Sequence, residues 1–198
     1  RLWVAVADVS HYVREGTALD REAQARGVSV YLPSRAIPML PEVLSADLCS
    51  LLPNEDRLAM VVRVDYDRAA ACTGADFCAA VIRSRGRLDY PGVAAALGGD
   101  TRGKRKAYEA FLPSLRAMDA LARKLRRQRQ ERGALDLDLP QAVIELDRDD
   151  PRLVRAIRRA RRDPGERAAY AMIEEFMLSG TAFFLDRTSP VLISAKSP

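Results

Sequence analysis

The sequence predicts a mixed α/β fold, with largely antiparallel strands and helices that flank the sheet. Three observations lead to this class. An apolar run at 2–8 is typical of a buried strand, and the Val-rich segment 57–67 is close enough to the second strand segment 75–90 to form an antiparallel hairpin. Apolar residues in 104–132 recur at helical spacing. The expected order of elements is β-α-β-β-β-α-α-β-α-β.

The first elements of the chain are short. The strand 2–8 ends at Asp8, and Thr17 is placed to cap a helix that Gly27 ends. A further short strand is expected at 28–33.

The stretch 31–53, YLPSRAIPMLPEVLSADLCSLLP, is apolar but cannot form one long helix. Prolines interrupt it at four positions, namely Pro33, Pro38, Pro41 and Pro53. We therefore expect a stiff ribbon that begins at Tyr31 and contains one or two short helical turns within 41–51.

The next segments predict a hairpin and a short helix. Segments 57–67 and 75–90 form the hairpin, with the turn at Thr73 and Gly74. The helix spans 91–99, because proline suits a first helical turn and glycine suits a helix end.

The segment 104–132 predicts a long basic helix that ends at Gly133. Pro113 either kinks this helix or marks its true start. The apolar side chains on one face are Phe111, Leu115, Met118, Leu121 or Ala122, and Leu125.

The last third of the chain contains an alternating segment, a connector and a helix. Segment 134–147 predicts a strand with one wet face, broken at Pro140. We expect a partly helical basic connector at 148–165, an amphipathic helix at 166–186 and a short strand at 190–194.

The composition is that of a soluble globular protein, with 48% hydrophobic and 30% charged residues. No apolar run approaches the roughly 20 residues that span a bilayer. The odd number of cysteines, Cys49, Cys72 and Cys78, argues against a disulfide framework and predicts a cytoplasmic protein. Because Arg1 directly precedes a core strand, we expect an incomplete piece of a longer domain.

The formal net charge is +5, and the basic residues cluster in 102–132 and 152–167. Clustered cations attract polyanions by releasing condensed counterions. A solvated helix face explains the same pattern, so both interpretations stay open.

The motifs exclude several kinds of site. His11 is the only histidine, and there is no zinc-ligand spacing, phosphate-binding loop or serine nucleophile elbow. Asp8 either caps a turn or serves an active site. The acidic run 147–150 predicts a solvated turn.

Four residues are candidate ligand contacts. Glu174 and Glu175 lie in mid-helix, where they either form a structural salt bridge or contact a substrate. Tyr31 and Tyr90 lie where a strand gives way to a proline-containing turn, so they either stack on a base or pack in the core.

Together, these segments resemble the RNB catalytic domain of the ribonuclease II and ribonuclease R family, and ribonuclease R in particular. The resemblance rests on LWVAVADVSHYV, the IPMLP…LS…LCSL run, RGALDLDLP and MIEEFML. It implies one partial domain, with channel-wall strands and the proline ribbon in 1–67. The hairpin and the basic helix fill 68–132, and the last strand, connector and helix fill 133–198.

The resemblance implies 3′-to-5′ processive hydrolysis of single-stranded RNA to nucleoside 5′-monophosphates with Mg²⁺. It implies that Tyr31 stacks on terminal bases, that Tyr90 lies near the scissile end, and that Glu174 or Glu175 holds the terminal nucleotide. The family's metal-binding aspartates match no residue here and are expected before Arg1. The isolated piece is therefore expected to be inactive, and no obligate protein partner is evident.

The chain departs from the family pattern at a few positions, which favour the first of two alternatives; the second sets the resemblance aside. Ser179, Gly180 and Thr181 follow MIEEFML, Val143 or a neighbour stands at an aromatic position, and LISAKSP replaces a histidine-bearing segment. The first alternative is an RNB-like RNA-binding or regulatory module without catalysis. The second is a basic α/β protein whose charge serves solubility.

Overall fold

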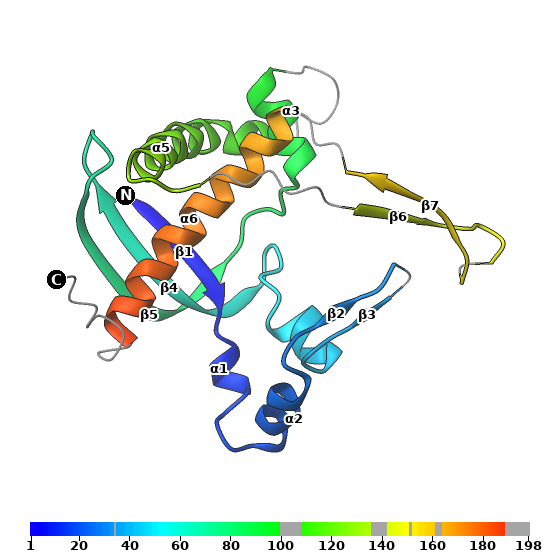
Figure 1. Ribbon diagram of the computed structural model, residues 1–198. Helices are drawn as coiled ribbons and strands as arrows, with labels where there is room; N and C mark the ends of the chain where they lie inside the picture. Colours follow the sequence, from blue (N-terminus) through cyan, green and yellow to red (C-terminus); the bar gives the residue numbers. More distant parts are fainter. Residues whose placement is uncertain (34, 100–107, 136–141, 151, 161–163, 189–198) are drawn as a thin grey trace.

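A three-stranded antiparallel sheet is central to the computed structural model, which describes residues 1–33, 35–99, 108–135, 142–150, 152–160 and 164–188 (Figure 1). Its strand order is β1-β4-β5, with β1 at Leu2–Ala7, β4 at Asp56–Tyr66 and β5 at Cys72–Arg83. The predicted mixed class with antiparallel pairing is therefore confirmed.

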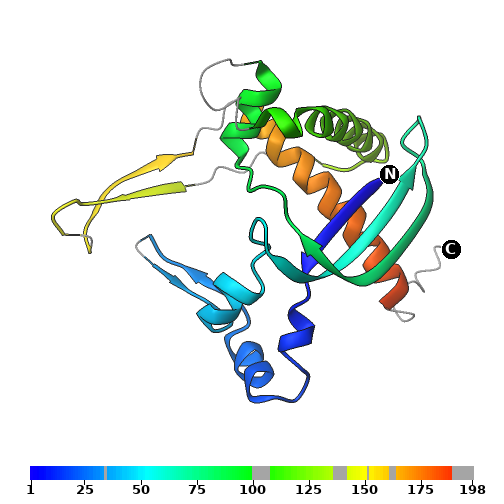
Figure 2. The same ribbon diagram turned by 180° about the vertical axis from the view of Figure 1, so that it is seen from behind.

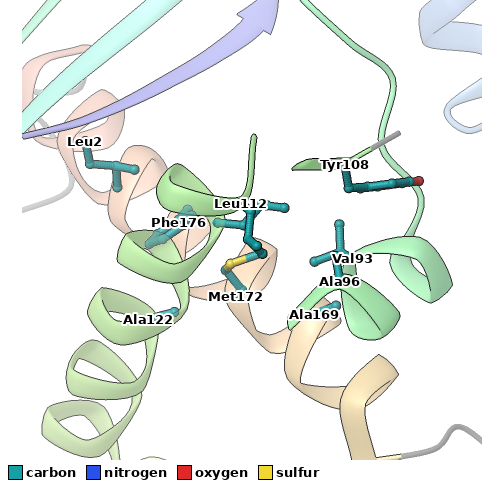
Figure 3. Packing of buried hydrophobic residues seen from close by; sticks show 10 residues of the cluster. Leu2, Val93, Ala96, Tyr108, Leu112, Ala122, Ala169, Met172 and Phe176 are labelled. Atoms are coloured by element: carbon teal, nitrogen blue, oxygen red, sulfur yellow. The ribbon is translucent and has the colours of Figure 1, made fainter. Parts of the chain in front are cut away.

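Three helices pack together beside this sheet. They are α3 at Tyr90–Gly98, α5 at Leu112–Glu131 and α6 at Pro164–Thr188. Helix α6 lies across one face of the sheet, where a Cβ on Gly180 would come within 3.3 Å of Val4 Cγ1. Figure 3 shows the core that results, with Val93 of α3 and Met172 of α6 among its members.

Residues at the start of β1 point alternately to the two faces of the sheet. Leu2, Val62 and Val64 are buried on the face that α6 covers, and successive strand residues point to opposite faces. Trp3 therefore points away from α6; it pairs with Arg63 across β1 and β4 and remains largely exposed.

The turn between β4 and β5 lies at Asp67–Ala71, so the prediction of a turn at Thr73 and Gly74 was wrong. The Asp67 carboxylate accepts hydrogen bonds from the amides of Ala69 and Ala71, which closes the turn early and leaves Gly74 paired with Asp65. Side chains of α5 also hold this turn from outside, because Lys124 and Gln128 donate to its backbone carbonyls. The second strand spans Cys72–Arg83, so it both begins and ends earlier than the predicted segment 75–90.

Most helix predictions are confirmed. The Thr17 hydroxyl caps α2 at Ala18–Arg26, and Gly27 ends it with φ 71°. A 3₁₀ turn, η2 at Glu109–Phe111, precedes α5, so Pro113 marks the start of the long helix. The predicted residues 104–107 and the predicted strand 190–194 lie outside the described residues.

The predicted connector contains a strand. Strand β7 at Val154–Arg159 pairs antiparallel with β6 at Ala142–Leu146, which corrects the expected partial helix. Val154 and Ile157 face Leu146 and Ile144 across the pair, and this cross-strand contact favours the strand. The hairpin projects from the rest of the molecule (Figure 1). Pro140 lies outside the described residues.

The described residues between 9 and 53 form a part of the molecule that we call the N-terminal lobe. It begins with α1 at Val9–Tyr12 and contains the proline ribbon that starts at Tyr31. In this ribbon, β2 at Val30–Tyr31 pairs with β3 at Ala36–Ile37, and η1 at Val43–Leu48 is one π-helical turn. In both views the β2–β3 and β6–β7 hairpins extend on the same side of the molecule (Figure 2). Among the described helices, none combines the length and apolarity needed to cross a membrane.

Candidate functional site

Tyr31 lies at the end of β2 and is 81% exposed. Its neighbours Val30, Leu32 and Ile37 are exposed apolar residues of the same hairpin. Because the ring is outside the core, the core-packing alternative does not hold for Tyr31.

The ribbon that carries Tyr31 is tied to the lobe by its backbone. The Met39 amide donates to the Ser29 hydroxyl at 2.9 Å, and the Arg26 guanidinium donates to the Pro38 carbonyl at 2.9 Å. Leu40 and Leu44 are buried just beyond. The hairpin therefore presents its aromatic ring from an anchored base.

Tyr90 occupies the first turn of α3, where Asp89 caps the helix. Its ring stacks on Tyr170 of α6, with centroids 3.6 Å apart and planes inclined by 16°. Tyr90 also lines an apolar cavity of about 270 Å³, together with Leu115, Met172 and Ile173 among others.

Glu174 and Glu175 point in different directions on α6. Glu175 is 4% exposed, and its Oε1 accepts bonds from Arg129 Nη2 at 2.7 Å and Arg129 Nε at 3.0 Å. The Glu174 side chain is 58% exposed and meets the same guanidinium at 3.2 Å. The structural salt bridge therefore describes Glu175, whereas Glu174 keeps most of its carboxylate in water.

The surroundings of Arg129 form a more polar cavity of about 400 Å³. Tyr66, Gln128 and Ser179 are among its lining residues. Burial raises the pKa of the Tyr66 hydroxyl, and a hydrogen bond with Ser179 opposes this rise.

The structure brings Tyr90 and Glu174 into one region through Tyr170. Tyr170 stacks on Tyr90 and precedes Glu174 by one helical turn on α6, so the two lie on the same face of the helix. Tyr31 belongs to a separate hairpin. Sequence reasoning missed Tyr170 and Arg129; the only local signal was the spacing of four residues between Tyr170 and Glu174.

The described residues do not fit a magnesium site, since they contain no group of three or more acidic, histidine or cysteine side chains placed to hold a metal ion. Asp8 accepts from the His11 amide and the Ser10 hydroxyl, so it caps α1. The acidic run is a turn, as predicted, because the Asp147 carboxylate accepts from the amides of Asp149 and Asp150.

Contacts within this turn also lower the pKa values of two of its carboxyl groups. Two backbone hydrogen bonds hold the pKa of Asp147 below its usual value, and the Arg152 guanidinium does the same for the pKa of Asp150. Both groups are thus engaged within the protein.

Part of the first basic cluster is paired within the molecule. Arg123 bonds to Asp119 at 3.0 Å, and Lys124 donates to a backbone carbonyl of the β4–β5 turn. The basic residues at 104–106 lie outside the described residues, so the charge alone identifies no ligand.

Comparisons with known proteins agree on one family. The RNB domain model matches residues 1–183. Ribonuclease R of Aquifex aeolicus (strain VF5) is 43% identical over 181 residues, which cover 90% of this chain and 24% of that protein. Ribonuclease R of Escherichia coli (strain K12) is 42% identical over 178 residues, which cover 90% of this chain and 21% of that protein.

A solved structure is similar over nearly the same span. Mycoplasma genitalium RNase R in complex with ribose methylated single-stranded RNA gives a TM-score of 0.82 at 32% identity, covering 93% of this chain and 28% of that one. The chain thus spans about a quarter of the length of these relatives.

Proposed function

The chain belongs to the RNB domain family, and from this premise we propose that it supplies the RNA-holding wall of a 3′-to-5′ exoribonuclease. The substrate class is single-stranded RNA, which is released as nucleoside 5′-monophosphates. The ribonuclease R relatives and the RNA complex of the Mycoplasma protein support this proposal.

The exposed Tyr31 is the observation that carries the proposal. An aromatic ring that is 81% exposed on an anchored hairpin offers its face to a base, and stacking of this kind contributes about 1–3 kcal/mol per base. Because bases of any identity stack, the contact suits an enzyme that degrades RNA without reading its sequence.

We further propose that this chain alone does not hydrolyse RNA. The family resemblance implies Mg²⁺, which would activate water and stabilise the leaving oxygen, but the described residues offer no carboxylate cluster to bind it. The family resemblance implies that the metal-binding aspartates precede Arg1. The three free cysteines are consistent with the proposed action in the reducing cytoplasm.

Binding of a short labelled single-stranded RNA, followed by fluorescence anisotropy, tests the RNA-holding function. Tyr31→Ala should weaken binding by about 1–3 kcal/mol without changing the salt dependence, because stacking releases no counterions. Tyr12→Ala, at a tyrosine of the same lobe that contacts His11, is the matched control. No RNA binding even at low salt would contradict the proposal.

Incubation of the chain with uniformly labelled RNA and Mg²⁺ tests the proposed inactivity. We expect intact RNA on a denaturing gel, and processive release of mononucleotides would overturn this part of the proposal.

A second candidate is an RNB-like RNA-binding module without catalysis. The lack of a carboxylate cluster among the described residues is consistent with it. A longer form of the protein that includes such a cluster and degrades RNA with Mg²⁺ would rule this candidate out.

A further inference from the structure

We infer that Tyr170 is a positioning residue, which holds the Tyr90 ring in the orientation that receives a nucleotide of the bound RNA. This inference rests on the proposed RNA-holding function. It adds a residue on α6 to the region that contains Tyr90 and Glu174.

The geometry of the ring pair is the first support. Centroids 3.6 Å apart and planes inclined by 16° place the two rings face to face, so Tyr170 covers one face of Tyr90. A base can then stack only on the other face of Tyr90. The stacked pair therefore fixes the plane in which an RNA base can stack and the face of Tyr90 on which it does so.

The packing around Tyr90 explains why a positioning residue is needed. Tyr90 borders the cavity of about 270 Å³ described above, so close packing does not fix the ring on that side. Its backbone is held at the first turn of α3 and its side chain is partly buried against the core cluster, but the cavity leaves room for the ring to change rotamer. Contact with Tyr170 removes that freedom before RNA arrives and lowers the entropic cost of binding.

The base of Tyr170 is itself well fixed. Ala169 and Met172, on either side of it in α6, are buried against α3, where Val93 and Ala96 lie (Figure 3). Tyr170 thus extends from a rigid part of the helix pair. Glu174, whose carboxylate is exposed, follows one turn later on the same face of α6.

A double-mutant cycle on RNA affinity tests the inference. We expect Tyr90→Ala to weaken binding of a short single-stranded RNA about 5- to 160-fold, the range of one stacked base. Tyr170→Ala should weaken binding in the same direction, with an unchanged salt dependence. In the Tyr90→Ala background it should have no further effect, because Tyr170 acts through Tyr90.

Two further variants separate positioning from loss of folding. Tyr170→Phe keeps the flat ring and should bind as the unchanged protein does. Tyr170→Leu keeps apolar bulk beside α3 without a stacking face, so it should retain the melting temperature and still bind weakly.

The contrary results separate failure of this inference from failure of the proposed function. Unchanged affinity in Tyr170→Leu, or no effect of Tyr90→Ala while Tyr31→Ala still weakens binding, overturns the inference and leaves the proposed function standing. Additive losses in the cycle also overturn it, because Tyr170 would then contact RNA directly. If the unchanged protein binds no RNA, the proposed function fails and the inference fails with it.

Discussion

Arg129 is shared unequally between two adjacent glutamates, and this difference separates a structural role from a binding role. Its guanidinium bonds twice to the buried Glu175 and once to the exposed Glu174. A carboxylate in water can accept hydrogen bonds from ribose hydroxyls, whereas one enclosed by its cation cannot. The resemblance to the family pointed to either residue, and the geometry favours Glu174.

Glu175→Gln should lower the free energy of unfolding by about 1.5–3 kcal/mol, because a buried charge-assisted hydrogen bond is lost. Chemical denaturation measures this change. Glu174→Gln is the matched variant, which should stay within about 0.5 kcal/mol of the unchanged protein. Equal losses from the two substitutions would contradict the assignment.

Glu174→Gln should instead narrow the difference in affinity between an RNA and the DNA of the same sequence. The 2′-hydroxyl distinguishes the two polymers, and an anionic acceptor binds it more strongly than a neutral amide does. Anisotropy titrations with both oligonucleotides measure the ratio. A ratio that stays the same would exclude Glu174 from ribose recognition.

Helix α3 has two glycines that should respond in opposite ways to alanine. A Cβ at Gly92 would collide with the ring and hydroxyl of Tyr108. The hydroxyl oxygen of Tyr108 accepts a hydrogen bond from the Asp89 amide at 3.2 Å. A Cβ at Gly98 would meet nothing within 4 Å. Helix α3 therefore contains one glycine that the Tyr108 side chain approaches closely, Gly92, and one with open space around it, Gly98.

Gly92→Ala should destabilise the protein by about 1–3 kcal/mol, because overpacking outweighs the helix propensity that alanine adds. Gly98→Ala should be neutral or stabilising by up to about 1 kcal/mol. Thermal unfolding of both variants provides the comparison. Destabilisation by Gly98→Ala of the same size would refute the role given to Tyr108.

The β6–β7 hairpin depends on its turn, in which Asp147 accepts two backbone amides. Asp147→Ala should speed amide exchange in Val154–Arg159 at neutral pH, as hydrogen–deuterium exchange can show. The pKa of Asp147 is lower in the folded protein than in the unfolded chain. Its contribution to the stability of the hairpin is therefore present above the unfolded pKa and is lost as the pH falls through the folded pKa. Asp149→Ala, two residues along the same turn, is the control and should leave this amide exchange unchanged.

The same hairpin shows where local sequence patterns fail. Thr17, Gly27 and the apolar face of 104–132 predicted their helices because caps and periodicity act within a few residues. The basic segment around Val154 became a strand only because β6 lies beside it. The face-to-face contact of Tyr90 and Tyr170 likewise depends on the packing of α3 against α6, which no local pattern encodes.

On the scale of the whole molecule, the projecting hairpin is separable from the core. Strands β6 and β7 pair with each other, whereas the main hydrophobic cluster draws on β1, α3, α5 and α6. Replacing 142–159 with a flexible linker should therefore leave the melting temperature nearly unchanged by circular dichroism. Met172→Ala, in the cluster, should cost about 2–5 kcal/mol by comparison. A cooperative loss of the whole fold in the linker variant would contradict this division.

Trp3 has a practical consequence for such measurements. It is the only tryptophan in the sequence and is already 57% exposed on the outer face of β1. Indole emission shifts to longer wavelength mainly when a ring passes from an apolar to an aqueous environment, so denaturation should displace the spectrum only slightly. The overlapped phenol rings at the junction of α3 and α6 should give a sharper optical signal in the near ultraviolet, because their coupling vanishes when the two helices separate.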